Sequence, residues 1–78
     1  MADKEMQEVY EEFVLSYVKS HPKCQQLDAI AEIRKAFFIN EMADPGIPAL
    51  RNAVSSLIEK GVIQADEDSP LSKLSLAS

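Results

Sequence analysis

Few side chains in this sequence have the types and spacing that catalysis requires. His21 is the only histidine and Cys24 the only cysteine, and a nucleophilic Cys–His pair would also need an orienting third group and a pocket. We expect instead an exposed loop histidine and a half-buried thiol at the start of a strand. With one cysteine and two glycines, the sequence offers no disulfide, no cysteine-based zinc site and no glycine-rich phosphate loop. It therefore predicts that the protein is not an enzyme.

The acidic clusters are no better suited to catalysis. Glu8, Glu11 and Glu12 share one face of a predicted helix, and a convex helix face provides no cleft for acid–base chemistry. We interpret them as a solvated face. The acidic run at 66–68 lacks the further oxygen ligands that a divalent cation needs. We expect no metal ion and no cofactor.

Binding chemistry is better represented, on the polar face of a helix predicted over residues 47–60. Arg51 suits the O6 and N7 acceptors of guanine, and Asn52 or Ser55 can reach adenine or a phosphate. An ordinary solvated helix face explains the same pattern equally well, because a single arginine is weak evidence for DNA binding. We expect the positively charged side chains of Arg34, Lys35, Lys23 and Lys60 to contact phosphates. The full set of residues expected to contact DNA is Arg51, Asn52, Ser55, Ser56, Arg34, Lys35, Lys23 and Lys60.

The charge distribution argues in the other direction. The formal net charge is −5. Residues 1–20 hold five acids and two lysines, residues 21–63 hold five acids and five bases, and residues 64–78 hold three acids and one lysine. Phosphates would be repelled by an acidic loop tip, and eight bases allow only modest, salt-sensitive affinity for DNA. The alternative is a basic protein partner, bound through Asp66, Glu67, Asp68, Glu8 and Glu12.

Hydrophobic periodicity predicts three helices, near 4–20, 26–39 and 47–60. Pro22 stops the first helix, Asp-Pro-Gly at 44–46 separates the second from the third, and Gly61 is placed to cap the third. The short segment 22–26 is expected to be extended, and a β-hairpin is predicted at 62–65 and 71–77 around a turn at 66–70. The predicted buried face of the second helix consists of Leu27, Ile30, Ala31, Ile33, Phe37 and Phe38. The third helix is expected to bury Leu50, Ala53, Val54, Leu57 and Ile58. We expect the main core contributions from Phe13, Ile30, Phe37, Leu50, Leu57 and Val62.

The order of these elements and the segment IPALRNAVSSLIEKGVIQADED, residues 47–68, resemble the winged-helix superfamily. The resemblance implies a mainly α fold with a small β-hairpin: three helices plus a C-terminal two-stranded wing. It covers the chain as one domain, 1–78, in which we expect residues 1–5 and 78 to be frayed. The connection at 40–47 is longer than the three- or four-residue turn of a helix-turn-helix unit.

Two functions follow as expectations. The first is a small sequence-specific protein that binds double-stranded DNA, such as a transcriptional or phage/plasmid-type regulator, which is the commonest role in the superfamily. It would act as a homodimer through helix one, with Tyr10, Leu15 and Val18 at the seam, although burial within one chain explains these residues equally well. The second is an acidic winged-helix interaction module, an adaptor or a DNA-mimicking inhibitor, whose groove between the third helix and the hairpin takes an amphipathic helix. No apolar run approaches the roughly 20 residues of a membrane span, so we expect no membrane partner and a cytoplasmic location.

Overall fold

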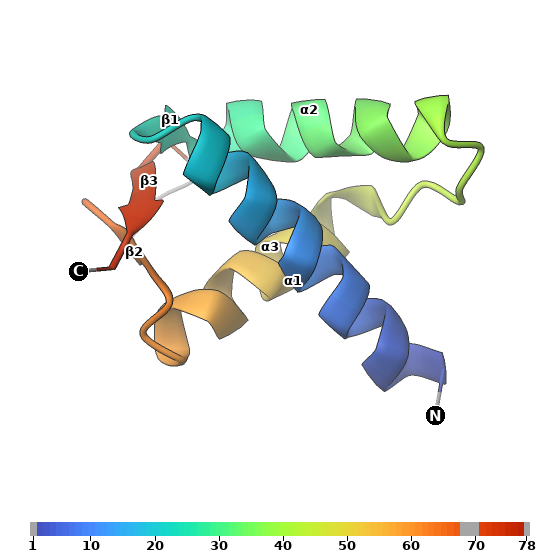
Figure 1. Ribbon diagram of the computed structural model, residues 1–78, viewed down its shortest axis with the longest axis horizontal. Helices are drawn as coiled ribbons and strands as arrows, with labels where there is room; N and C mark the ends of the chain where they lie inside the picture. Colours follow the sequence, from blue (N-terminus) through green and yellow to red (C-terminus); the bar gives the residue numbers. More distant parts are fainter. Residues whose placement is uncertain (1, 68–70, 78) are drawn as a thin grey trace.

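The computed structural model describes residues 2–67 and 71–77, with side chains from residue 6 onward. Its elements are α1 (Ala2–Ser20), β1 (Cys24–Gln25), α2 (Gln26–Ile39), α3 (Gly46–Glu59), β2 (Ile63–Ala65) and β3 (Lys73–Leu76) (Figure 1). These bounds confirm the three predicted helices and the C-terminal hairpin. The helix α1 begins inside the segment 1–5 that was predicted to be frayed. Two other predictions lie outside the described residues: the frayed end at residue 78, and positions 68–70 of the turn.

The strands form one antiparallel sheet in the order β1-β3-β2. The register pairs Cys24 with Leu74, and Ile63 with Leu76. The segment predicted to be merely extended therefore contributes a third strand, which lies beside the hairpin and pairs with its second arm. In Figure 1 the sheet lies at one end of the helices, α1 runs diagonally across the molecule, and α2 lies along the upper edge.

The core lies between the three helices and the inner face of the sheet. Phe37 is its largest fully buried side chain and contacts two rings of α1, with centroid distances of 4.4 Å to Phe13 and 5.6 Å to Tyr10. Phe13 and Val62 are only partly buried and pack against the core. The buried core residues are Val14, Val18, Ile30, Ile33, Phe37, Leu50, Ala53, Val54, Leu57, Ile63 and Leu74. The predicted stripe of α3 is thus confirmed, except that Ile58 is exposed.

The predicted buried face of α2 was wrong at three positions. Phe38 is 82% exposed, Leu27 is 41% exposed, and Ala31 is also exposed. Successive residues of an α-helix point 100° apart, so Phe37 and Phe38 cannot both face the core. The core face is occupied by Gln26, Ala29, Ile30, Ile33 and Phe37.

Both α2 and α3 end with the same pair of backbone hydrogen bonds. At the end of α3, the N–H groups of Gly61 and Val62 donate to the carbonyls of Ile58 and Leu57. Gly61 has φ +74, which confirms it as the residue that ends the helix in left-handed conformation. The end of α2 repeats this pattern around Glu41, whose φ of +58 is unusual for a residue with a side chain.

Candidate interaction surfaces

The exposed face of α3 presents the polar groups that the sequence predicted. Arg51, Asn52 and Ser55 are exposed. Ser55 follows Asn52 by three positions and Arg51 by four, so its side chain neighbours both of them on the helix surface. Within the described part of the chain, Arg51 has no ion-pair partner and the side chains of Asn52 and Ser55 have no hydrogen-bond partner. These three side chains are free to bind a ligand.

Ser56 and Lys60 differ from those residues, because both contact Glu11 of α1. Lys60 Nζ lies 2.6 Å from Glu11 Oε1, and the hydroxyl of Ser56 donates to Glu11 Oε2 at 3.3 Å. The side chain of Glu11 is only 10% exposed, so our interpretation of this residue as part of a solvated face was wrong. The buried carboxylate instead ties α1 to the end of α3.

The electrostatics of Glu11 reflect this contact. Burial raises the pKa of the carboxyl group, but hydrogen bonds from Lys60, Gln7 and Ser56 and the charge of Lys60 lower it more, so the pKa falls below its ordinary value of 4.5. Glu11 is therefore a carboxylate at neutral pH. It holds the ammonium of Lys60 beside α1, where this cation is already neutralised.

Two further bases that were expected to contact phosphates are also paired with acids. Arg34 donates from Nε and Nη2 to the two carboxylate oxygens of Asp44, at 3.0 and 2.7 Å. Asp44 also accepts a hydrogen bond from the N–H of Gly46. Together these bonds lower the pKa of Asp44 to about 2 and fasten the 40–45 connection to α2. Lys35 pairs more loosely with Glu32, at 3.4 Å.

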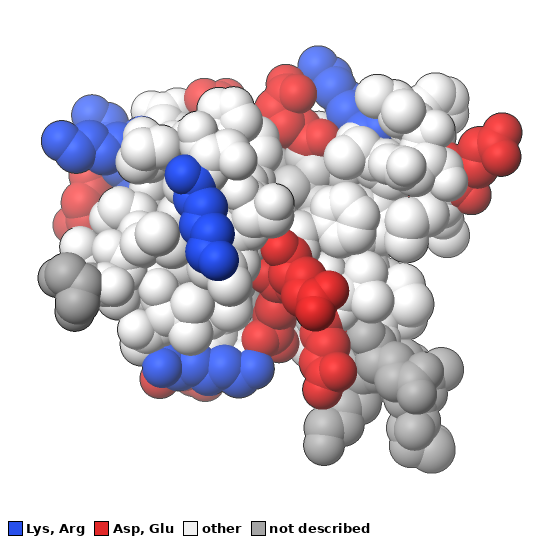
Figure 2. Space-filling view, viewed as in Figure 1, with Lys and Arg blue, Asp and Glu red and all other residues white. Residues whose placement is uncertain are grey.

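A groove with acidic walls runs between α1 and the end of α3. Its floor is apolar, and its rim carries the exposed carboxylates of Glu8 and Glu12 beside the Glu11–Lys60 ion pair. The lining residues are Glu8, Glu11, Glu12, Leu15, Leu57, Lys60 and Val62. Figure 2 shows acidic side chains gathered along the middle of the face that α1 crosses. Glu8 and Glu12 are exposed and have no ion-pair partner among the described residues.

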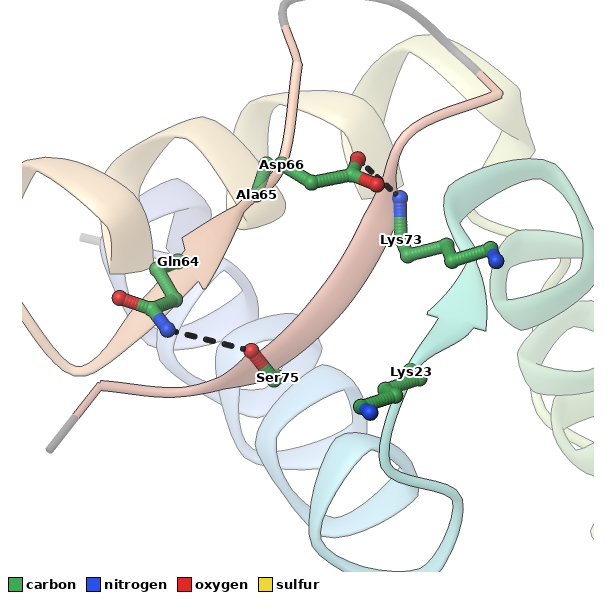
Figure 3. Close-up of a pocket in the computed structure, with 6 residues that line it drawn as sticks. All are labelled: Lys23, Gln64, Ala65, Asp66, Lys73 and Ser75. Carbon is green, nitrogen blue, oxygen red and sulfur yellow. Dashed lines mark hydrogen bonds between the residues drawn. The ribbon is translucent and has the colours of Figure 1, made fainter.

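The outer side of the hairpin carries a hollow whose lining includes both positively and negatively charged side chains (Figure 3). It is lined by Lys23, Gln64, Ala65, Asp66, Lys73 and Ser75. Asp66 accepts a hydrogen bond from the backbone N–H of Lys73 at 2.7 Å, so one acid of the predicted wing tip closes the hairpin. Glu67 is exposed, and Asp68 lies outside the described residues. The ammonium groups of Lys23 and Lys73 have no acidic partner among the residues that the structure describes.

The apolar residues of helix one that were suggested for a dimer interface pack within a single chain. Val18 is fully buried, and Tyr10 and Leu15 pack against the core. Within the described ranges there is no group of three or more histidine, cysteine or acidic residues that could hold a metal ion. None of the described helices is long and apolar enough to cross a membrane.

Comparisons with known proteins find no match: no family model, no curated protein and no solved structure resembles the chain significantly.

Proposed function

We propose that the chain is a winged-helix domain that binds a basic amphipathic protein segment in the acidic groove between α1 and α3. The fold assignment is supported by the chain order α1-β1-α2-α3-β2-β3, by the sheet order β1-β3-β2 and by the resemblance of residues 47–68. The interaction function is carried by one observation, which is the combination of an apolar floor and a carboxylate rim in a single groove.

The groove matches the two faces of a basic amphipathic helix. Leu15 and Val62, which are only partly buried, offer apolar surface to the apolar face of such a helix. Glu8 and Glu12 lie one helical turn apart on the rim and can pair with lysine or arginine side chains of the ligand. The acidic character of α1 would also steer a cationic partner toward this side of the molecule.

The proposal is tested by fluorescence anisotropy with a labelled synthetic peptide that has leucines on one helical face and lysines on the other. The double variant Glu8→Gln/Glu12→Gln should weaken peptide binding at least about tenfold if each lost charge pair contributes ~1 kcal/mol. The matched control, Glu41→Gln/Glu67→Gln, removes the same charge elsewhere and should weaken binding much less. A peptide of the same composition with scrambled order should bind poorly. Equal losses in the two double variants, or equal binding of the scrambled peptide, would show that only net charge matters.

DNA binding through α3 is a second candidate, favoured by the free group of Arg51, Asn52 and Ser55. Its weakness is the number of available cations, since Arg34, Lys35 and Lys60 are paired with acids. Loss of three phosphate contacts would reduce both the affinity and its salt dependence.

A mobility-shift titration distinguishes this candidate. If α3 enters a groove of DNA, Arg51→Ala should weaken binding to a selected duplex by roughly 1–3 kcal/mol. Lys19→Ala, which removes an exposed positive charge from α1, serves as the control and should change little. Replacement of Asp66, Glu67 and Asp68 by their amides should strengthen binding. Absence of any complex at low salt, where attraction is least screened, would exclude this candidate without affecting the first.

A further inference from the structure

The outer face of α2 carries an exposed stripe with the spacing of a helix-pairing seam. Leu27, Ala31, Arg34 and Phe38 are separated by four, three and four residues, which is the alternation of a coiled-coil interface. Phe38 is the most exposed large apolar side chain in the described part of the chain, at 82%, and Ile39 beside it is 76% exposed. In Figure 1 no other described element lies above α2. A phenylalanine exposed to this extent, next to an exposed isoleucine in the sequence, is the kind of surface that a partner covers.

The stripe is complementary to itself when two copies run antiparallel. A two-fold axis midway between Ala31 and Arg34 places Phe38 of each copy over Leu27 of the other. It also places the small Ala31 opposite the aliphatic stem of Arg34, whose guanidinium is held to one side by Asp44. Such pairing of one patch with itself is what a two-fold dimer requires. The hollow beside Phe38, lined by Ala31, Arg34, Lys35, Phe38 and Asp44, lies on the same face.

The charges of α2 favour the same antiparallel arrangement. The acids Asp28 and Glu32 lie in its first half, and the bases Arg34 and Lys35 lie in its second half. Antiparallel packing therefore brings Lys35 of one copy toward Asp28 of the other, whereas parallel packing would place like charges together. With two acids and two bases, α2 carries no net charge, although the whole chain carries −5. Two acidic chains can thus approach each other at this helix with little repulsion.

From this stripe and its charges we infer that the protein forms a homodimer through antiparallel packing of α2 against α2 of a second copy. The inference depends on α2 alone and goes beyond the proposed function, whose groove lies between α1 and α3. A dimer would present two such grooves, or two copies of the α3 face, to one ligand.

The first test measures mass by size-exclusion chromatography with light scattering, from micromolar to millimolar protein. The wild type should approach twice the monomer mass, and Phe38→Ser should raise the dimer dissociation constant at least about tenfold. Leu76→Ser, at an exposed leucine of β3, is the matched control and should leave the dissociation constant unchanged. Circular dichroism should show both variants folded, because both side chains are exposed. A wild type that stays monomeric throughout, or a Phe38→Ser variant that dimerises equally well, overturns the inference.

The second test determines the orientation with single cysteines in a Cys24→Ala background. In the antiparallel arrangement the two copies of residue 31 lie about 4.5 Å apart along the helix axis, and the two copies of residue 27 lie about 16 Å apart. Ala31→Cys should therefore form a covalent dimer under mild oxidation, and Leu27→Cys should not. Crosslinking of both variants, or of neither, contradicts antiparallel packing. Peptide or DNA titrations are not involved, so failure of either binding function leaves this result intact.

Discussion

Replacement of Lys60 by methionine tests whether the contact between α1 and the end of α3 stabilises the fold. The substitution keeps most of the aliphatic stem and removes the ammonium that lies 2.6 Å from Glu11 Oε1. A hydrogen bond to a charged group contributes about 1.5–3 kcal/mol, and the lower part of that range applies because the side chain of Lys60 is 56% exposed. We expect Lys60→Met to lower the free energy of unfolding by about 1–2 kcal/mol at pH 7. For a domain of this size that corresponds to roughly 5–15 °C in melting temperature.

The effect should also depend on pH in a defined direction. The pKa of Glu11 in the folded protein lies below its ordinary value of 4.5, so the carboxylate contributes its full stabilisation above pH 4.5. That contribution is lost as the pH falls through the folded-state pKa, where Glu11 becomes protonated. The stability difference between wild type and Lys60→Met should therefore be largest near neutral pH and shrink below pH 4.5.

Urea unfolding followed by circular dichroism at pH 7 and at several acidic pH values measures both quantities. Lys35→Met is the matched control, because its partner Glu32 lies at 3.4 Å and both side chains are at least half exposed. This control should cost less than about 0.5 kcal/mol. A Lys60→Met variant as stable as the wild type would refute the role assigned to Glu11, and so would a stability difference that is the same at every pH.

Four other variants probe the fold. Leu57→Asp should unfold the domain, because Leu57 is 4% exposed and a buried unpaired charge cannot be accommodated. Ser55→Asp, at an exposed position, should melt near the wild-type temperature. Equal melting temperatures for the two variants would show that the orientation assigned to α3 is wrong. Glu41→Gly should raise the free energy of unfolding by about 0.5–1 kcal/mol, since φ is +58 at this position, and a lower melting temperature would contradict this. Asp44→Asn should be less stable than the wild type above pH 4, and this difference in stability should vanish as the pH falls through about 2. Acid titrations followed by circular dichroism measure it. A difference in stability that persists in acid would point to a cause other than the carboxylate.

Periodicity was sufficient to predict the helices because their boundaries are marked by strong local signals. Pro22 cannot continue α1, and Gly61 adopts the positive φ that ends α3. The strand β1 was predicted only as an extended segment. Its identity as a strand depends on pairing with β3, about 50 residues later in the sequence, and two residues carry no periodicity of their own.

The errors on α2 have a different origin. Phe37 and Phe38 are adjacent and equally apolar, so composition alone assigns both to the core. A projection of the helix separates them, because Gln26, Ala29, Ile30, Ile33 and Phe37 already complete one face. Phe38 then falls on the other side, with Leu27 and Ala31, and the projection alone would have indicated the exposed stripe.

The misinterpretation of Glu11 could not have been avoided in this way. Its neighbours Glu8 and Glu12 are exposed, as expected for a solvated face, and only the approach of α3 distinguishes the residue between them. Lys60 is 49 positions away in the sequence, so no local pattern pairs it with Glu11.

Pairing of charges inside the fold decides which ligand the remaining charges can attract. Each ion pair removes one acid and one base, so the paired residues leave the net charge of −5 unchanged and concentrate it in fewer groups. The cations without an acidic partner in the described ranges lie on α1, on α3 and at the hollow that Lys23 and Lys73 share, whereas Glu8 and Glu12 lie together on the rim of one groove. So few unpaired cations release few counterions from DNA, while adjacent carboxylates above an apolar floor create a local potential that attracts a cationic segment. The charge pattern therefore supports a basic protein ligand in the groove more strongly than a phosphate backbone along α3.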